Sequence, residues 1–244
     1  MLTVDINCDV GEGVNNEELL MPYISSCNIA CGAHAGDVET IDRVIKLAQK
    51  YQVKIGAHPS FPDRKNFGRE VMDISLEKLE ISLINQIKLI QERLDLFGGK
   101  LNHVKAHGAL YNLSAVDSNI AEVIVNSIKE TAPNAILYVP YNSVIEKVAL
   151  QNKLNIKLEA FADRNYNDDL TLVSRSQKNA VITNKDEVID HISNMIIHQQ
   201  VKTISNILVS IKPETFCVHG DNSEAIELVK HIHHSLTQKG ISIA

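Results

Sequence analysis

Aromatic side chains are scarce in this sequence of 244 residues. They make up 5% of the chain and Trp is absent, so aliphatic side chains must supply most of the core. Basic residues are also in deficit, because 24 Lys and Arg stand against 30 Asp and Glu. A net charge of −6 lacks the basic surface that nucleic-acid binding needs, and we expect no nucleic-acid partner.

Long apolar runs are missing as well. No stretch of about 18 apolar residues occurs, so a membrane-spanning helix is not expected. A secretory signal begins with a basic segment that is followed by an apolar one, and residues 1–13 do not contain this pattern. We therefore expect a cytoplasmic protein that has no membrane partner.

Cysteine occurs only four times, at Cys8, Cys27, Cys31 and Cys217, and no Cys-x-x-Cys pair is present. This spacing matches the usual zinc clusters poorly. In a reducing compartment we expect these thiols to be buried and to pack as small apolar side chains.

Three functional motifs are absent. The chain has no phosphate loop of the form G-x-x-x-x-G-K-[ST], and Gly-Glu-Gly at 11–13 is too short for a dinucleotide fingerprint. It also lacks the G-x-S-x-G turn that carries a nucleophilic serine. These absences disfavour an autonomous NTPase and a covalent serine mechanism.

The sequence instead alternates strand and helix patterns. Residues 2–10 alternate apolar and polar side chains, which is typical of a strand. Residues 37–52 place apolar side chains at helical spacing, with Asp37 as a candidate N-cap. By the same criteria we expect further strands at 27–32, 53–58, 101–108, 135–140, 157–163 and 215–221, and further helices at 75–99, 120–128, 143–152, 185–199 and 223–240.

This order of elements predicts the fold class. No linker rich in Pro, Gly or Ser interrupts the pattern, so one domain over residues 1–244 is expected. Six or seven strand–helix units in this length predict an α/β fold, a (β/α) barrel that is seven-stranded and distorted. An open doubly wound sheet is the alternative.

Chemically active side chains follow most of the predicted strands. They are Asp9, His34, His58, His107, Asp163, Arg164, His219 and Asp221. A parallel α/β fold brings the carboxyl ends of its strands to one face, where several loops build one active site. A single histidine at a strand end is usually structural, but the convergence of so many strands favours a functional site.

Two of the strands predict a polar barrel interior. Alternate positions share one face of a strand, and the two polar faces are Asp5, Asn7 and Asp9, and His103, Lys105 and His107. Burying so many ionisable groups is costly unless they pair with one another or bind a ligand. The polar interior therefore also favours a binding site.

Two further groups of residues carry opposite expectations. The basic residues of the predicted loops are Arg64, Lys65, Arg69, Arg164 and Arg175. Their place after strands favours capture of a carboxylate or phosphate over a merely solvated loop. The histidines of the predicted helices are expected on solvated faces without a role, and they are His191, His198, His231, His233 and His234.

Seven segments resemble a known family in their order along the chain. They are DINCDVGE, NIACGAHAGD, GAHPSFPDRKNFGR, HVKAHGALYN, FADRNY, LVSRSQ and CVHGD. Together they resemble the LamB/YcsF family, that of the A subunit of bacterial ATP-dependent 5-oxoprolinase. The resemblance implies a seven-stranded barrel similar to the glycoside hydrolase/deacetylase barrels. It also implies opening of the 5-oxoproline (pyroglutamate) lactam to L-glutamate, coupled to ATP hydrolysis, together with separate B and C subunits.

The resemblance also implies roles for the strand-end residues. We expect Asp9, His107 and Asp163 as acid and base, with His34, His58 and His219 shaping the site. Charge on a phosphorylated intermediate would be balanced by Lys105 and Arg64. The substrate carboxylate would be bound by Arg69 or Arg175, and Asn7, Arg164 and Asp221 complete the substrate-binding set. Because no phosphate loop is present, we expect the partner subunits to bind most of the ATP.

Two other functions stay open at this point. Asp9, His34 and His58 resemble the metal set of deacetylases that hydrolyse N-acetylated carbohydrates, so a divalent metal is an open question. The second open function is that of a non-catalytic subunit that only binds the substrate. The chain departs from the family pattern at Ala106, Leu170, Ser174 and Asn179, which bears most on the loop over residues 165–180.

Overall fold

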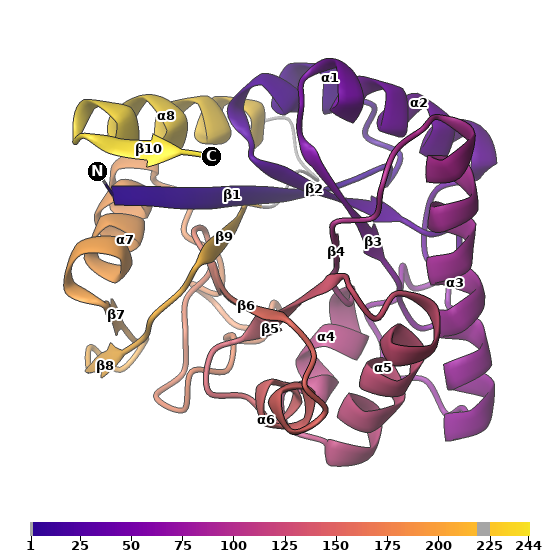
Figure 1. The fold of residues 1–244 in the computed structure, drawn as a ribbon. Coiled ribbons are helices and arrows are strands. Elements are labelled where there is room, and N and C mark those ends of the chain that lie inside the picture. The colour runs from indigo at the N-terminus through magenta and orange to yellow at the C-terminus, as the bar shows by residue number, and fades with distance from the viewer. Residues whose placement is uncertain (1, 219–224) are drawn as a thin grey trace.

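Seven parallel strands close into a barrel within the residues that the computed structural model describes, 2–218 and 225–244 (Figure 1). They are β1 Leu2–Val10, β2 Ser26–Ala30, β3 Lys54–His58, β4 His103–Val104, β5 Ile136–Pro140, β6 Ile156–Phe161 and β9 Thr215–Val218. The last strand pairs with both β6 and β1, which closes the sheet. The predicted barrel is confirmed and the open sheet is wrong. The expected site residues His219 and Asp221 lie outside the described residues.

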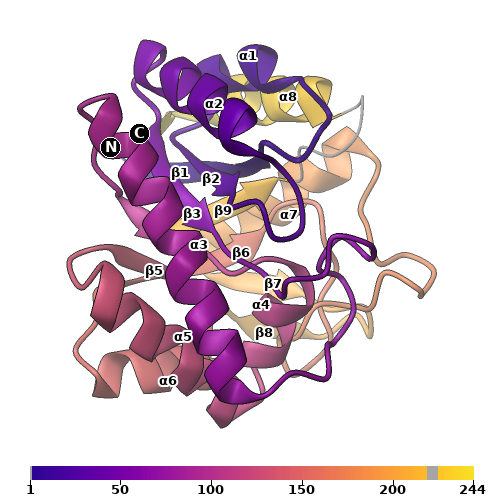
Figure 2. The ribbon, with the colours of Figure 1, turned by 90° about the vertical axis from the view of Figure 1, so that its right-hand side faces the viewer.

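Helices surround the barrel on its outside (Figure 2). After α1 Glu17–Leu20 and the 3-10 turn η1 Met21–Tyr23 they are α2 Val38–Lys50, α3 Leu76–Leu96, α4 Gly108–Ser114, α5 Ser118–Thr131, α6 Val144–Gln151, α7 Lys185–His198 and α8 Ala225–Gln238. The predicted N-cap of α2 is confirmed, because the Asp37 side chain accepts a hydrogen bond from the Thr40 amide. The apolar stripe of α2, Ile41, Val44, Ile45 and Ala48, is buried against the barrel.

Several elements were not predicted, and α1 and η1 are two of them. Helix α4 is short, and strands β7 Gln200–Lys202 and β8 Leu208–Ser210 form an antiparallel hairpin outside the barrel. Strand β10 Ile241–Ile243 pairs in parallel with the start of β1, beside α8 (Figure 1). Strand β4 has two paired residues where eight were expected, because the chain turns into α4 directly after His107.

The barrel interior is polar, as predicted. Asn7 donates hydrogen bonds to Glu159 Oε1 at 2.9 Å and to Thr215 Oγ1 at 2.8 Å. His103 lies in the interior as well, where its Nε2 is 2.7 Å from Asn28 Oδ1. Gly56 makes room for that ring, because a Cβ there would lie 2.2 Å from His103 Nε2. The interior is therefore filled by hydrogen-bonded polar side chains that pair strand to strand.

Apolar side chains fill the space between the barrel strands and the surrounding helices. All four cysteines are free and buried, as the sequence predicted. Between residues 2 and 218, and from 225 onward, no helix combines the length and the apolar character needed to cross a membrane.

Candidate active site

A pocket of about 740 Å³ opens at the carboxyl ends of the barrel strands. Its wall includes Asp9 from the end of β1, His58 from the end of β3 and Glu159 from β6. Lys105 and His107 line it from the segment between β4 and α4. The structure thus brings side chains from several strands to one site, as the parallel fold predicted.

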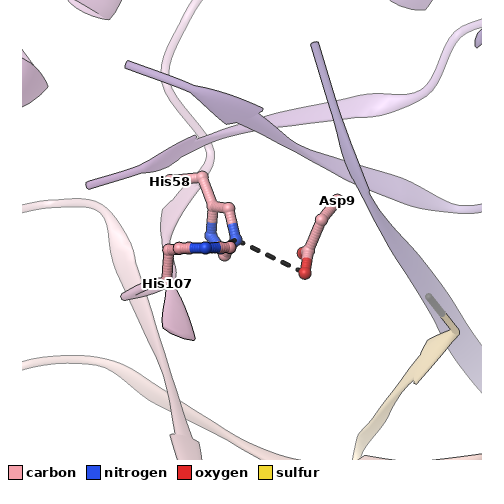
Figure 3. A group of neighbouring side chains, drawn as sticks. All are labelled: Asp9, His58 and His107. Atoms are coloured by element: carbon pink, nitrogen blue, oxygen red, sulfur yellow. Dashed lines mark hydrogen bonds and ion pairs between the residues drawn. The ribbon is translucent and has the colours of Figure 1, made fainter. Parts of the chain in front are cut away.

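Two histidines and an aspartate meet on one wall of the pocket (Figure 3). His58 Nε2 lies 3.3 Å from Asp9 Oδ2 and 3.0 Å from His107 Nδ1. The second nitrogen of each ring is fixed by the backbone. His58 Nδ1 donates to the Lys105 carbonyl at 2.8 Å, and His107 Nε2 donates to the Phe67 carbonyl at 2.9 Å. Both rings are therefore held in one orientation and one tautomer.

Glu12 belongs to the same wall, although sequence reasoning did not select it. Its Oε1 lies 3.1 Å from His34 Nε2, 3.3 Å from His107 Nδ1 and 3.9 Å from His58 Nε2. The signal that could have found it is its place two residues beyond β1, in the loop that follows Asp9. Glu12 thus places a carboxylate among three imidazoles.

His34 supports the wall from behind. Its ring stacks on His107, with centroids 3.8 Å apart and planes at 4°, and its Nδ1 lies 2.9 Å from Ser60 Oγ. Gly68 brings the following loop onto these rings with φ at +62°, and a Cβ there would lie 3.1 Å from His107 Cδ2. The charged loop after β3 therefore packs against the histidines and is part of the site.

Burial sets the protonation of the histidines. Burial, with a smaller contribution from the neighbouring His58, lowers the pKa of His34 to about 3. The pKa of His107 is lowered to about 3 for the same reasons, burial first and then His58 and His34. Both rings are neutral near pH 7 and can accept a proton or bind a cation through one nitrogen.

Lys105 is the buried cation of the barrel interior. Its Nζ lies 3.1 Å from Asp9 Oδ1, 3.1 Å from Glu159 Oε1 and 3.0 Å from Cys217 Sγ. Burial alone lowers the pKa of Lys105, but Asp9, Cys217 and Glu159 raise it well above its usual value. The ammonium therefore stays charged and fixes the position of Asp9.

The arginines divide into two groups. Arg69 and Arg175 line the pocket. Arg64 instead donates to the carbonyls of Gly32 at 3.0 Å and Gly36 at 2.9 Å, so it holds the loop after β2. The expected role of Arg64 in balancing charge on an intermediate therefore has no support in its position.

Arg164 lines the pocket, but its guanidinium is engaged with the backbone. Its Nη2 donates to the Val173 carbonyl at 2.6 Å and its Nε to the Ala180 carbonyl at 3.2 Å. Asn7 lies deeper, where its Oδ1 accepts a hydrogen bond from Lys105 Nζ at 3.3 Å. Asp163 is buried and is not among the described residues that line the pocket. The side chains of Arg164 and Asn7 therefore hold neighbouring parts of the site in place through hydrogen bonds to the backbone and to Lys105.

The expectation for His191 is wrong. Its ring stacks on Tyr166 with centroids 6.1 Å apart, its Nε2 is buried, and burial lowers its pKa to about 4. In the loop over 165–180, Leu170 and Asn179 have φ of 68° and 65°, a region that favours glycine. The departures at these two positions thus place side chains in a left-handed backbone, which asparagine adopts more readily than leucine. Nothing in the structure explains Ser174.

Comparisons with known proteins agree with the fold. A protein of Natranaerobius thermophilus, named as the A subunit of 5-oxoprolinase, is 41% identical, and the match covers 100% of this chain and 96% of that protein. One of the same name from Staphylococcus saprophyticus is 42% identical over 99% of this chain and 98% of that protein. The crystal structure of a lactam utilization protein from Thermus thermophilus matches with a TM-score of 0.93 and 32% identity, over 99% of each chain.

The sequence model of the LamB/YcsF family matches residues 4–244, which is nearly the whole chain. The strand-end motifs that suggested this family supply Asp9, Glu12, His58 and His107 to one pocket, and His34 contacts Glu12 and His107 from behind. This chain belongs to the LamB/YcsF family.

Proposed function

We propose that this chain is the A subunit of an ATP-dependent 5-oxoprolinase, which opens the lactam of 5-oxoproline to give L-glutamate. The observation that carries the proposal is the pocket wall where two carboxylates and three imidazoles meet a buried Lys105. It occurs in a chain related over its full length to proteins that carry the name of the 5-oxoprolinase A subunit.

The pocket suits a small polar ring. Its volume of about 740 Å³ falls within the range for small-molecule sites, and both apolar and charged residues line it. The Tyr111 hydroxyl faces the Glu159 carboxylate. Both residues line the pocket, where they offer a hydroxyl and a carboxylate to a polar ligand.

The reaction needs activation because a five-membered lactam is a stable amide. In our proposal the amide oxygen takes the γ-phosphoryl group of ATP, and ADP leaves. Water then adds to the activated carbon and loses its proton to a base, while the ring C–N bond breaks as the nitrogen is protonated. A second water hydrolyses the remaining acyl phosphate to glutamate and phosphate.

The wall supplies groups for each of these steps. Asp9, Glu12 and His107 are the candidates that accept the proton of the attacking water and return one to the ring nitrogen. Lys105 balances negative charge that develops beside Asp9. Arg69 or Arg175, both on the pocket lining, binds the carboxylate of the substrate. Proton transfer is not assigned to Asp163, because this residue does not line the pocket.

The proposal includes two partners. The relatives are named as one subunit of an enzyme, which favours a multi-subunit complex, and we propose B and C subunits as the partners. Because the chain has no phosphate loop, we propose that these subunits bind most of the ATP, in the cytoplasm where ATP is available.

The test is glutamate release from 5-oxoproline and ATP. Three samples are compared: this chain alone, the B and C subunits without it, and all three together. We expect glutamate only from the complete mixture. No glutamate from that mixture, with the B and C subunits folded and able to hydrolyse ATP, would overturn the proposal.

A further inference from the structure

The facing nitrogens of His58 and His107 leave a chemical question. A carbonyl oxygen can only accept a hydrogen bond, so each neutral ring uses its one N–H to donate to the backbone. His58 donates to the Lys105 carbonyl, and His107 donates to the Phe67 carbonyl. The other two nitrogens, His58 Nε2 and His107 Nδ1, therefore carry lone pairs and point at each other across 3.0 Å. Two lone pairs at this distance repel unless a positive charge lies between them.

Carboxylate oxygens close around the same point. Asp9 Oδ2 lies 3.3 Å from His58 Nε2, and Glu12 Oε1 lies 3.3 Å from His107 Nδ1. Side-chain atoms of Asp9, His58 and His107 that could bind a metal all lie within 4.8 Å of one another. The site thus presents two nitrogens and the Asp9 carboxylate around a single point, with the Glu12 carboxylate beside His107.

We propose that Asp9, His58 and His107 bind a divalent transition-metal cation, with Glu12 as a fourth ligand. Bonds of about 2.1 Å to such a cation separate neighbouring ligand atoms by about 3.0 Å in an octahedral site and about 3.4 Å in a tetrahedral one. The separations of 3.0 Å and 3.3 Å match these values, and Glu12 Oε1 lies farther, 3.9 Å, from His58 Nε2. This site differs from the Asp9, His34 and His58 set that the sequence suggested.

The ligand chemistry narrows the choice of metal. Two imidazole nitrogens with carboxylate oxygens suit Zn²⁺, Mn²⁺, Fe²⁺ or Co²⁺. Mg²⁺ and Ca²⁺ prefer ligand sets made of oxygen alone. The four cysteines are buried elsewhere in the core, and none belongs to the group formed by Asp9, His58 and His107.

Supporting hydrogen bonds fix the ligands as metal sites require. The Lys105 and Phe67 carbonyls hold the tautomer and orientation of the two rings. The Ser60 hydroxyl donates to the Phe61 carbonyl at 2.8 Å, so its oxygen accepts from His34 Nδ1 at 2.9 Å and fixes that ring behind Glu12, whose Oε1 lies 3.1 Å from His34 Nε2. Lys105 occupies the other oxygen, Oδ1, of Asp9 and leaves Oδ2 toward the histidines.

The competing explanation is an extra proton shared between the two rings. In that case a protonated imidazole ring would lie between two carboxylates, and the site would not bind a metal ion. Metal binding can be measured without substrate or partner subunits, so this inference stands apart from the proposed reaction and fails separately from it.

The test is titration of Co²⁺ into the full chain after dialysis against a chelator. Visible absorption reports the coordination of Co²⁺, and calorimetry measures how many Co²⁺ ions bind to each chain. Thermal unfolding measures how much the bound ion stabilises the fold. We expect one Co²⁺ per chain, displacement by Zn²⁺, and a rise in Tm on binding. Asp9→Asn and His58→Gln should weaken binding by about 10-fold or more. His198 is an exposed histidine at the end of α7, so His198→Gln is the matched control and should bind Co²⁺ as tightly as the unaltered chain does.

Two results would overturn the proposal. One is a folded, unaltered chain that binds neither Co²⁺ nor Zn²⁺. This result would mean that the two histidine rings share a proton instead of binding a metal. The other is unchanged affinity in both His58→Gln and His107→Gln, with circular dichroism showing that each is folded. The first result needs no variant, so a failure of one variant to fold leaves the test intact.

Discussion

Lys105 Nζ lies 3.1 Å from Asp9 Oδ1 and 3.1 Å from Glu159 Oε1, so one buried ammonium joins β1 and β6 across the barrel interior. Lys105→Met removes the cation and leaves these carboxylates buried without it. We expect the free energy of unfolding to fall by about 3–5 kcal/mol, as for other buried pairs that lose one partner. Urea denaturation of the two proteins measures this loss.

The control for this variant is an exposed ion pair. Lys88 and Glu130 lie 3.7 Å apart with side chains about half exposed. Lys88→Met should change the free energy of unfolding by less than about 1 kcal/mol. An equally small change in Lys105→Met would show that the buried ammonium does not stabilise the barrel.

The buried histidines predict a loss of stability in mild acid. The pKa of His107 and His34 is about 3 in the folded chain, against 6.5 for an ordinary histidine. Between these values the unfolded chain binds protons that the folded chain does not, so stability falls as pH falls. Each histidine contributes up to about 1.4 kcal/mol per pH unit.

Urea denaturation at pH 7, 6 and 5 in the presence of a chelator measures this slope. His107→Gln should make it shallower, and His198→Gln, which alters an exposed histidine, should leave it unchanged. A slope that is the same in all three proteins would contradict the burial of His107 as a neutral ring.

The positions of two arginines predict different kinetic effects. Arg69 lines the pocket, and Arg64 donates to the Gly32 and Gly36 carbonyls. With the complete enzyme, Arg69→Ala should raise KM for 5-oxoproline by about 10-fold or more, because a charged hydrogen bond is lost. Arg64→Ala should change KM by less than about 2-fold while lowering Tm. The reverse pattern would assign the substrate carboxylate to Arg64.

The backbone at Asn179 predicts a difference between two small substitutions. Its φ is 65° and its side chain is exposed, so the residue matters mainly through its conformation. Asn179→Ala should lower the free energy of unfolding by about 1 kcal/mol, whereas Asn179→Gly should not lower it. Chemical denaturation compares the two variants, and equal stability would exclude the left-handed conformation at this position.

The sequence predicted those parts of the site that lie on strands. His58 and His107 follow strands whose apolar pattern is clear, and parallel strands end on one face, so their meeting could be expected. Lys105 was placed in the interior by its period of two with His103 and His107. These predictions needed only local pattern and topology.

The residues that sequence reasoning missed, or to which it gave another role, are placed by tertiary contacts. Glu12 lies in a loop, where no period fixes the direction of a side chain, and its contacts come from three other segments. Arg64 turns toward carbonyls of a different loop. His191 is packed by Tyr166, which belongs to a long loop without a periodic pattern. Local sequence contains none of these contacts.

The most direct test of the account is glutamate release by the complete enzyme carrying Asp9→Asn. The substitution keeps the shape of the side chain and removes its charge beside Lys105 and His58. We predict that turnover falls by about 100-fold or more, while His198→Gln keeps the unaltered rate. Turnover within about threefold of the unaltered enzyme in folded Asp9→Asn would contradict the assignment of lactam opening to this site.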